Sequence, residues 1–162
     1  MDLQGPKIRI SSFIDNKVLL SRGDQFTLDA ELPKSEGTQT AVGIAYKQLP
    51  NDLSAGNTLL LDDGKIILKV LQIVGPKILT EVLQGGILSN NKGINLHGGG
   101  LSASALTEKD KQDIHTAAKA EADYVAISFP IHADDIRETK RLLKEAGSNA
   151  SVIAKIERAE AL

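Results

Sequence analysis

The 162-residue sequence contains no cysteine and no tryptophan, and only 3% of its residues are aromatic. The lack of cysteine excludes a disulfide framework, a thiolate nucleophile and a cysteine-ligated zinc site. Few aromatic side chains and a formal net charge of −2 disfavour binding to nucleic acid or to an anionic membrane. No apolar run approaches the roughly 18 residues of a membrane-spanning helix, and the first residues have no apolar secretory core. These absences predict a soluble, cytoplasmic protein.

The hydrophobic pattern divides the chain into two halves. Up to about residue 97, short runs of Ile, Val and Leu alternate with Gly, Asn and Asp, which is typical of strands joined by turns. Asp63-Gly64 and Gly75-Pro76 lie between such runs and predict hairpin turns. We expect a small antiparallel β domain of barrel or sandwich type. Its expected strands are Lys7–Ser12, Lys17–Leu20, Gln25–Leu28, Thr58–Leu61, Lys65–Val74, Lys77–Leu83 and Gly93–Leu96.

After the glycine run 98–100 the pattern changes to helices that alternate with apolar strands. This order is typical of an α/β fold with a parallel sheet. Two strands cannot close a barrel, so this half has the pattern of part of a larger sheet, with a complete two-layer α/β domain as the alternative. The expected elements are a helix capped by Thr107 and Asp110 that runs to about Ala122, a strand at Asp123–Phe129, a helix that begins at Asp134-Asp135 and ends before Gly147, and a strand at Ser151–Glu157.

Lys155 and Glu157 lie two residues apart at the end of the last expected strand, so their side chains leave the same face. In an α/β barrel this end of the strands lines the active site. A carboxylate there can hold a divalent cation, and an ammonium group can stabilise charge on a group in transfer. The alternative is an ordinary surface ion pair, although burying two charges without a function is costly.

Four segments resemble the pyruvate kinase family, and its bacterial members most. Val152–Leu162, an apolar strand followed by a small residue, Lys, an apolar residue and Glu, resembles the family's active-site signature. Asp2–Arg9 resembles the segment that leads from the catalytic barrel into an inserted lid domain, and Ser89–Leu96 resembles the segment that leaves the lid. Leu106–Asp110 resembles the start of the next barrel helix. The segments occur in the family's order and cover essentially the whole chain.

The resemblance implies a mixed fold, in which a small antiparallel β-barrel domain is inserted into a partial (β/α)8 TIM barrel. Residues 1–6 would be the end of a barrel strand and the lid entry, residues 7–97 the lid (B) domain, and residues 98–162 a truncated part of the barrel (A) domain. The implied reaction transfers the phosphoryl group of phosphoenolpyruvate to ADP, giving pyruvate and ATP in glycolysis. The full-length protein would be a homotetramer, whereas a fragment with exposed strand edges would self-associate and be inactive.

The resemblance also assigns roles to individual residues. Lys155 takes the position of the lysine that stabilises the transition state, and Glu157 that of a ligand of the catalytic Mg²⁺ or Mn²⁺. Arg9 and Lys92 match lid residues that contact the phosphates of the nucleotide and substrate. A planar guanidinium and an ammonium group suit that task, because both donate hydrogen bonds to phosphate oxygens.

Asp2 and Leu3 match the position of a monovalent cation. Members of the family that require potassium carry Thr, Lys, Glu and Thr at the positions of Leu3, Gln4, Lys7 and Ile10, so this sequence resembles members that need no K⁺. The ammonium group of Lys7 could supply the positive charge that K⁺ otherwise provides. We therefore expect a K⁺-independent enzyme.

Two other functions remain open from the residues alone. Lys155 could form a Schiff base with a carbonyl substrate in an aldolase-type barrel enzyme. The β half could instead be a non-catalytic module that binds a protein partner, in which case Lys155 would be dispensable.

Overall fold

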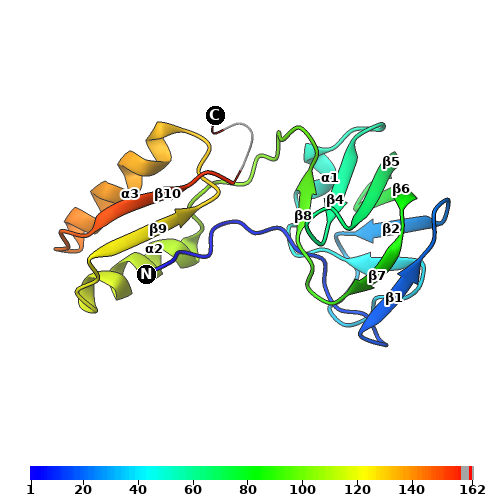
Figure 1. Ribbon diagram of the computed structural model, residues 1–162, viewed down its shortest axis with the longest axis horizontal. Coiled ribbons are helices and arrows are strands. Elements are labelled where there is room, and N and C mark those ends of the chain that lie inside the picture. The colour runs from blue at the N-terminus through cyan, green and yellow to red at the C-terminus, as the bar shows by residue number, and fades with distance from the viewer. Residues whose placement is uncertain (158–160, 162) are drawn as a thin grey trace. The chain divides into compact units, whose positions relative to one another are not determined.

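The computed structural model describes residues 1–157 and 161, and the chain forms two compact units (Figure 1). One unit consists of Met1–Lys7 together with Ser102–Leu162, and the other of Ile8–Leu101. Within the described ranges, no helix has both the length and the apolar character needed to cross a membrane.

The unit Ile8–Leu101 is built from two sheets. The larger has six strands in the order β3-β2-β6-β5-β4-β8, and the smaller pairs β1 with β7. All of these pairs are antiparallel except β2 with β3, which is parallel, so the expectation of a purely antiparallel domain is wrong at one edge. The elements are β1 Lys17–Leu20, β2 Gln25–Asp29, β3 Ala41–Gly43, α1 Leu49–Asp52, β4 Thr58–Leu61, β5 Ile66–Val74, β6 Lys77–Gln84, β7 Gly86–Ser89 and β8 Ile94–Leu96.

The two predicted hairpins are confirmed. β4 and β5 pair across the turn at Asp62–Lys65, and β5 and β6 pair across Gly75-Pro76. In the first turn Asp62, Asp63 and Gly64 all have positive φ, at 49°, 56° and 87°. Such angles are unusual for residues other than Gly, and Asp is among the side chains that tolerate them best. The turn therefore depends on the aspartates as well as on the glycine.

The strand expected at Lys7–Ser12 is wrong. Arg9 bridges Gly93 and Ile10 bridges Ile44, so this segment makes isolated bridges to two different neighbours and no continuous ladder. Its alternation is nevertheless real, because Ile8 and Ile10 are both buried. The pattern of apolar residues reports which side chains enter the core, and it does not report how many backbone partners the segment has.

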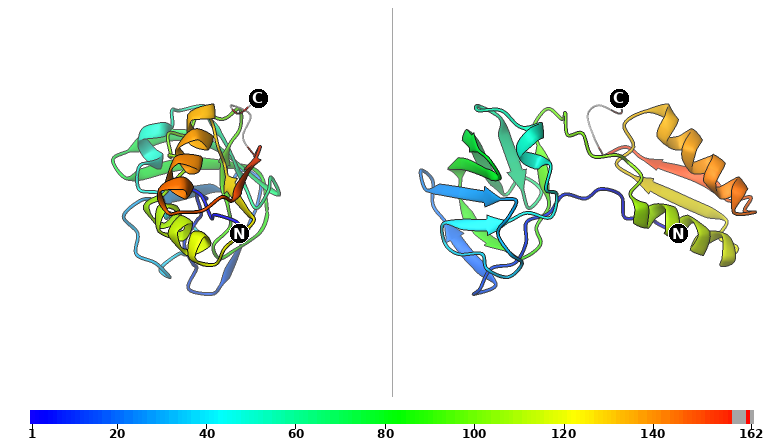
Figure 2. Two further views of the ribbon diagram at one scale, coloured as in Figure 1. Left: turned by 90° about the vertical axis from the view of Figure 1, so that its left-hand side faces the viewer. Right: turned by 180° about the vertical axis from the view of Figure 1, so that it is seen from behind.

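The other unit contains a parallel pair of strands, β9 (Tyr124–Ser128) and β10 (Ser151–Lys155), with helices α2 (Glu108–Lys119) and α3 (Ala133–Glu145). Both helices lie on one side of the two strands (Figure 2). Their contact with the sheet is apolar, because Ile114, Leu143, Val125 and Ile127 belong to one buried cluster. The predicted order of helix, strand, helix and strand is confirmed.

The N-terminal segment lies beside β9, along the edge that β10 does not occupy. The Leu3 amide donates to the Ala126 carbonyl at 2.8 Å, and the Ala126 amide donates to the Met1 carbonyl at 2.8 Å. Leu3 is only 1% exposed and joins the buried cluster under the helices. Three parallel segments, far apart in the sequence, therefore run together in the order N-terminus, β9, β10.

Both helices begin with a capping box in which an aspartate stands at the third helical position. Asp110 accepts hydrogen bonds from the Thr107 amide at 2.9 Å, and Thr107 Oγ1 accepts from the Asp110 amide at 3.1 Å, which confirms the predicted capping box. Asp135 accepts from the amides of Ile131 and His132 at 2.8 and 2.9 Å. These caps fix where each helix starts after its preceding loop.

Candidate active site

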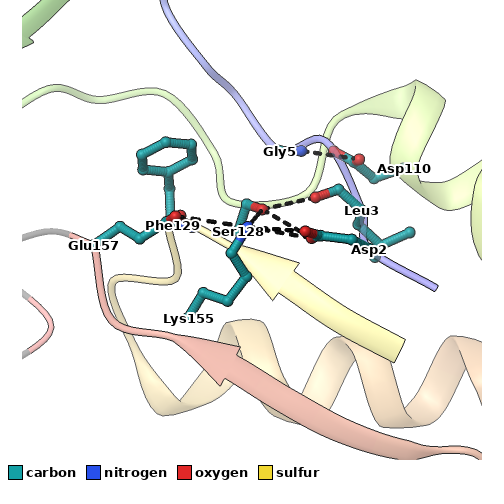
Figure 3. A network of polar contacts seen from close by, with 8 residues as sticks. All are labelled: Asp2, Leu3, Gly5, Asp110, Ser128, Phe129, Lys155 and Glu157. Atoms are coloured by element: carbon teal, nitrogen blue, oxygen red, sulfur yellow. Dashed lines mark hydrogen bonds and ion pairs between the residues drawn. The ribbon is translucent and has the colours of Figure 1, made fainter. Parts of the chain in front are cut away.

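A group of polar side chains gathers where the three parallel segments of the unit formed by Met1–Lys7 and Ser102–Leu162 end (Figure 3). Ser128 is the last residue of β9 and Lys155 the last of β10, and the two are paired in the strand register. Asp2 bridges Ala126, so its carboxylate is carried to the same edge. The ends of parallel strands lie at one edge of a sheet, and this is why residues separated by up to 153 positions meet here.

The ammonium group of Lys155 contacts three different side chains. Its Nζ donates to Ser128 Oγ at 2.8 Å and lies 3.2 Å from both carboxylate oxygens of Asp2. Glu157 Oε1 is 3.5 Å from the same nitrogen. A lysine ammonium has three donors, so the group can use all of them at once. The sequence predicted that Lys155 and Glu157 leave the same face, with an ion pair between them as the alternative interpretation, and the structure adds the other two partners.

These neighbours stabilise the protonated, positively charged form of Lys155. Burial lowers the pKa of Lys155, but the hydrogen bond to Asp2 and the charges of Glu157 and Asp2 outweigh burial and raise the pKa above its ordinary value. A raised pKa means that the ion pairs stabilise the folded state fully below the ordinary lysine pKa and are lost as the pH rises through the folded-state pKa. Lys155 is therefore an ammonium group throughout the neutral range.

Glu157 is held by the backbone as well as by Lys155. Its Oε2 accepts a hydrogen bond from the Phe129 amide at 3.2 Å, and its side chain is 34% exposed. Phe129 has a φ of 58°, a left-handed conformation that is rare for a bulky residue and costs about 1–3 kcal/mol. This conformation follows directly on Ser128, and the Phe129 N–H points to the carboxylate of Glu157 (Figure 3).

Ser128 is the site residue that the sequence analysis missed. It is 2% exposed, and its hydroxyl donates to the Leu3 carbonyl oxygen at 2.7 Å while accepting from Lys155. A serine at the end of an apolar strand is a weak signal alone. The register that places it opposite Lys155 could have identified it, but register between strands separated by a helix cannot be deduced from one sequence.

A glycine allows the N-terminal segment to pass close to this edge. Gly5 has a φ of 64°, and a Cβ at this position would lie 2.9 Å from both the Cβ and the carbonyl oxygen of Ser128. Its amide donates to Asp110 Oδ1 at 3.1 Å, and Asp110 is completely buried. The cap of α2 therefore also anchors the segment that carries Asp2.

The predicted monovalent-cation residues are brought together only in part. The carboxylate of Asp2 is paired with Lys155, and the Leu3 carbonyl accepts the Ser128 hydroxyl. Lys7 is exposed, and no ion pair of Lys7 is present among residues 1–157 and 161. The positive charge that faces Asp2 in this structure is thus that of Lys155.

The site contains carboxylates that could bind a divalent cation, but the described residues do not form a complete set of metal ligands. Across the described part of the chain, no group of three or more His, Cys, Asp or Glu side chains could enclose a metal ion. Glu157 nevertheless fits the predicted role, because a partly exposed carboxylate at a strand end is the kind of hard oxygen ligand that Mg²⁺ and Mn²⁺ prefer. Arg158, Ala159, Glu160 and Leu162, which complete the signature, lie outside the described residues.

Arg9 and Lys92 lie on neighbouring backbone segments of the β unit. Arg9 bridges Gly93, and its Nη1 donates to the Asn91 carbonyl at 2.7 Å. Lys92 Nζ lies 2.9 Å from Asp62 Oδ1, and its side chain is 33% exposed. The hydrogen bond from Lys92 is the main reason that the pKa of Asp62 is lowered. The two predicted phosphate contacts therefore share one region of this unit.

Comparison with known families decides the classification. The family model described as the pyruvate kinase barrel domain matches residues 1–162. The chain belongs to the pyruvate kinase family. The resemblance deduced from the four sequence segments is confirmed.

Curated pyruvate kinases from several bacteria are similar to this chain. The "Pyruvate kinase" of Buchnera aphidicola subsp. Acyrthosiphon pisum is 62% identical over 99% of the chain and 34% of its own length. The "Pyruvate kinase" of Haemophilus influenzae is 60% identical over 98% of the chain and 33% of its own length. The "Pyruvate kinase II" of Salmonella typhimurium is 58% identical over 99% of the chain and 34% of its own length. The chain thus spans about a third of the length of these pyruvate kinases.

Proposed function

We propose that the full-length protein that carries this chain transfers the phosphoryl group of phosphoenolpyruvate to ADP, giving pyruvate and ATP in cytoplasmic glycolysis. The observation that carries the proposal is the ammonium group of Lys155, held on three side chains beside Glu157 in a member of the pyruvate kinase family. Residues 7–97 would be a small β-barrel lid domain inserted into a (β/α)8 barrel, to which residues 1–6 and 98–162 contribute, in a homotetramer.

The proposed roles follow from what phosphoryl transfer requires. The reaction depends on positioning and on neutralising charge more than on covalent chemistry by the protein. Lys155 would bind the phosphoryl oxygens with its ammonium group, and Glu157 would hold a Mg²⁺ or Mn²⁺ ion, which neutralises phosphate charge when bound. Arg9 and Lys92 would bind phosphate oxygens of the nucleotide and substrate.

The Schiff-base alternative is disfavoured by the state of Lys155. An amine must be unprotonated to attack a carbonyl, and lysines with this function have a lowered pKa. The carboxylates of Asp2 and Glu157 act in the opposite direction, and the pKa of Lys155 is raised. A coupled assay of the full-length protein with phosphoenolpyruvate, ADP and Mg²⁺ tests the proposed function. Absence of turnover, or borohydride trapping of a carbonyl substrate on Lys155, would overturn it.

The proposed enzyme should need no potassium. In tetramethylammonium buffer its rate should change by less than about twofold when K⁺ is added, because the ammonium group of Lys7 would supply the positive charge of the ion. Lys7→Glu introduces the residue of potassium-requiring members and should make the rate rise on addition of K⁺. The interpretation fails if the unmodified protein is active only with K⁺.

Residues 1–162 alone should have no measurable kinase activity, because they span only 34% of the length of a related pyruvate kinase and would supply one of the metal ligands, Glu157. Purified chain should give no turnover at any Mg²⁺ concentration. The same chain with Lys155→Met is the control for kinase carried over from the expression host. A metal-dependent rate that disappears in the Lys155→Met chain would contradict the prediction.

A further inference from the structure

We propose that Ser128 is a positioning residue that sets the location of the Lys155 ammonium group for phosphoryl transfer. The inference rests on the proposed function for its catalytic consequence, but the contact itself rests on geometry alone. Ser128 and Lys155 are register partners at the ends of β9 and β10, so their backbones are fixed relative to each other by the parallel ladder. The side-chain contact is thus built on two rigid elements.

The Ser128 hydroxyl has a determined direction. A hydroxyl has one proton to donate and two lone pairs to accept with. The proton has a close acceptor in the Leu3 carbonyl at 2.7 Å, whereas Asp2 Oδ1 is 3.4 Å from the same oxygen. With the proton used on Leu3, the lone pairs of Ser128 are left for Lys155 Nζ at 2.8 Å. The hydroxyl therefore presents an acceptor, and not a donor, to the ammonium group.

Ser128 is also the most buried of the three partners of Lys155. It is 2% exposed, whereas the side chains of Asp2 and Glu157 are 63% and 34% exposed. Its contact with Nζ is the shortest of the three. The close approach of Gly5, where a Cβ would lie 2.9 Å from Ser128 Cβ, leaves little room for Ser128 to move. The carboxylates supply charge, and the buried hydroxyl supplies a fixed location.

A positioning role has a kinetic consequence that differs from a binding role. A reacting group displaced by about 1 Å can cost about 100-fold in rate, even when substrate still binds. Ser128→Ala removes the fixed acceptor and leaves Asp2 and Glu157 to hold the ammonium group. We expect kcat of the full-length protein to fall by about 10- to 100-fold, with the KM for phosphoenolpyruvate changed by less than about threefold. Ser128→Thr, which keeps the hydroxyl, should recover most of the lost kcat.

Thr139 provides a matched control. It is a fully buried hydroxyl of the same unit, and it donates to the Asp135 carbonyl at 2.8 Å. Thr139→Val removes a buried hydrogen bond in α3 that does not involve Lys155, and it should leave kcat within about twofold. The inference is overturned if Ser128→Ala keeps its kcat, or if Thr139→Val loses as much kcat as Ser128→Ala.

A second measurement does not depend on enzymatic activity. Acetic anhydride modifies unprotonated lysine amines, and mass spectrometry can compare Lys155 with the exposed Lys144 in one sample. Ser128→Ala should raise the labelling rate of Lys155 several-fold relative to Lys144, because Nζ loses the buried oxygen that holds it at 2.8 Å and becomes more accessible to the reagent. An unchanged ratio refutes the contact. If the unmodified protein has no kinase activity, the proposed function fails, and this labelling result still decides whether Ser128 holds Lys155.

Discussion

Replacement of Lys155 by Met in the full-length protein should lower kcat by a factor of about a thousand. Methionine matches the length of the lysine stem and lacks the charge, so the change removes the ammonium group with little change in volume. In the proposed reaction the ammonium group binds the oxygens of the phosphoryl group while that group is transferred. Hydrogen-bond donors of this kind stabilise the transition state more than the bound substrate. The KM for phosphoenolpyruvate should therefore change much less than kcat.

Steady-state kinetics at saturating Mg²⁺ measure both parameters. Lys144→Met replaces an exposed lysine of α3 and should keep kcat within about twofold, which controls for the chemical change itself. Lys155→Arg tests position at constant charge: a planar guanidinium cannot occupy the point between Ser128 and Asp2 that an ammonium group fills, so kcat should remain low. A Lys155→Met enzyme with more than a tenth of the original kcat would contradict the proposed role.

The candidate site was only partly predictable from the sequence. The strand expected at Ser151–Glu157 ends at Lys155, so Glu157 lies two residues beyond β10. The local pattern was nevertheless sufficient to predict that the two side chains are neighbours, since Lys155 Nζ lies 3.5 Å from Glu157 Oε1. The contacts of Lys155 with Asp2 and Ser128 join positions separated by 153 and 27 residues. Contacts of this kind depend on which strand lies beside which, and hydrophobic periodicity contains no such information.

The same distinction applies to the fold. Long, strongly patterned elements such as β5, β6 and the two long helices were predicted closely, because period and turn chemistry agree within each of them. β3 is three residues long and β7 follows Gly85, and neither has enough local pattern to be recognised. β1 and β7 form a sheet of their own, and this pairing could be seen only once the chain was folded.

Phe129 illustrates a local rule that is broken at the site. A bulky residue at a φ of 58° contradicts ordinary backbone preferences, so no sequence pattern predicts it. This conformation directs the Phe129 amide to Glu157, and the preceding residue, Ser128, contacts Lys155. Two adjacent residues of β9 and its loop thus contact both charged groups of the signature, and strain is most often found where a site constrains the backbone in this manner.

The largest loss of stability should come from Asp110→Ala. Asp110 is completely buried and accepts hydrogen bonds from the amides of Thr107 and Gly5. Loss of the helix cap costs about 1 kcal/mol, and the Gly5 amide left without its buried acceptor costs about 1–3 kcal/mol more. We therefore expect the unit to be destabilised by about 2–4 kcal/mol. The loss of stability exceeds that of an ordinary helix cap because the Asp110 carboxylate also joins the start of α2 to the N-terminal segment.

Asp135→Ala is the matched control, because Asp135 caps α3 through the amides of Ile131 and His132 and has no hydrogen bond to the N-terminal segment. It should cost only about 1 kcal/mol. Hydrogen–deuterium exchange of the full-length protein can separate the two effects. Asp110→Ala should speed exchange in α2 and also at residues 2–7, whereas Asp135→Ala should act on α3 alone. Equal exchange at residues 2–7 in both variants would show that Asp110 is a helix cap only, and that Asp2 reaches Lys155 without its help.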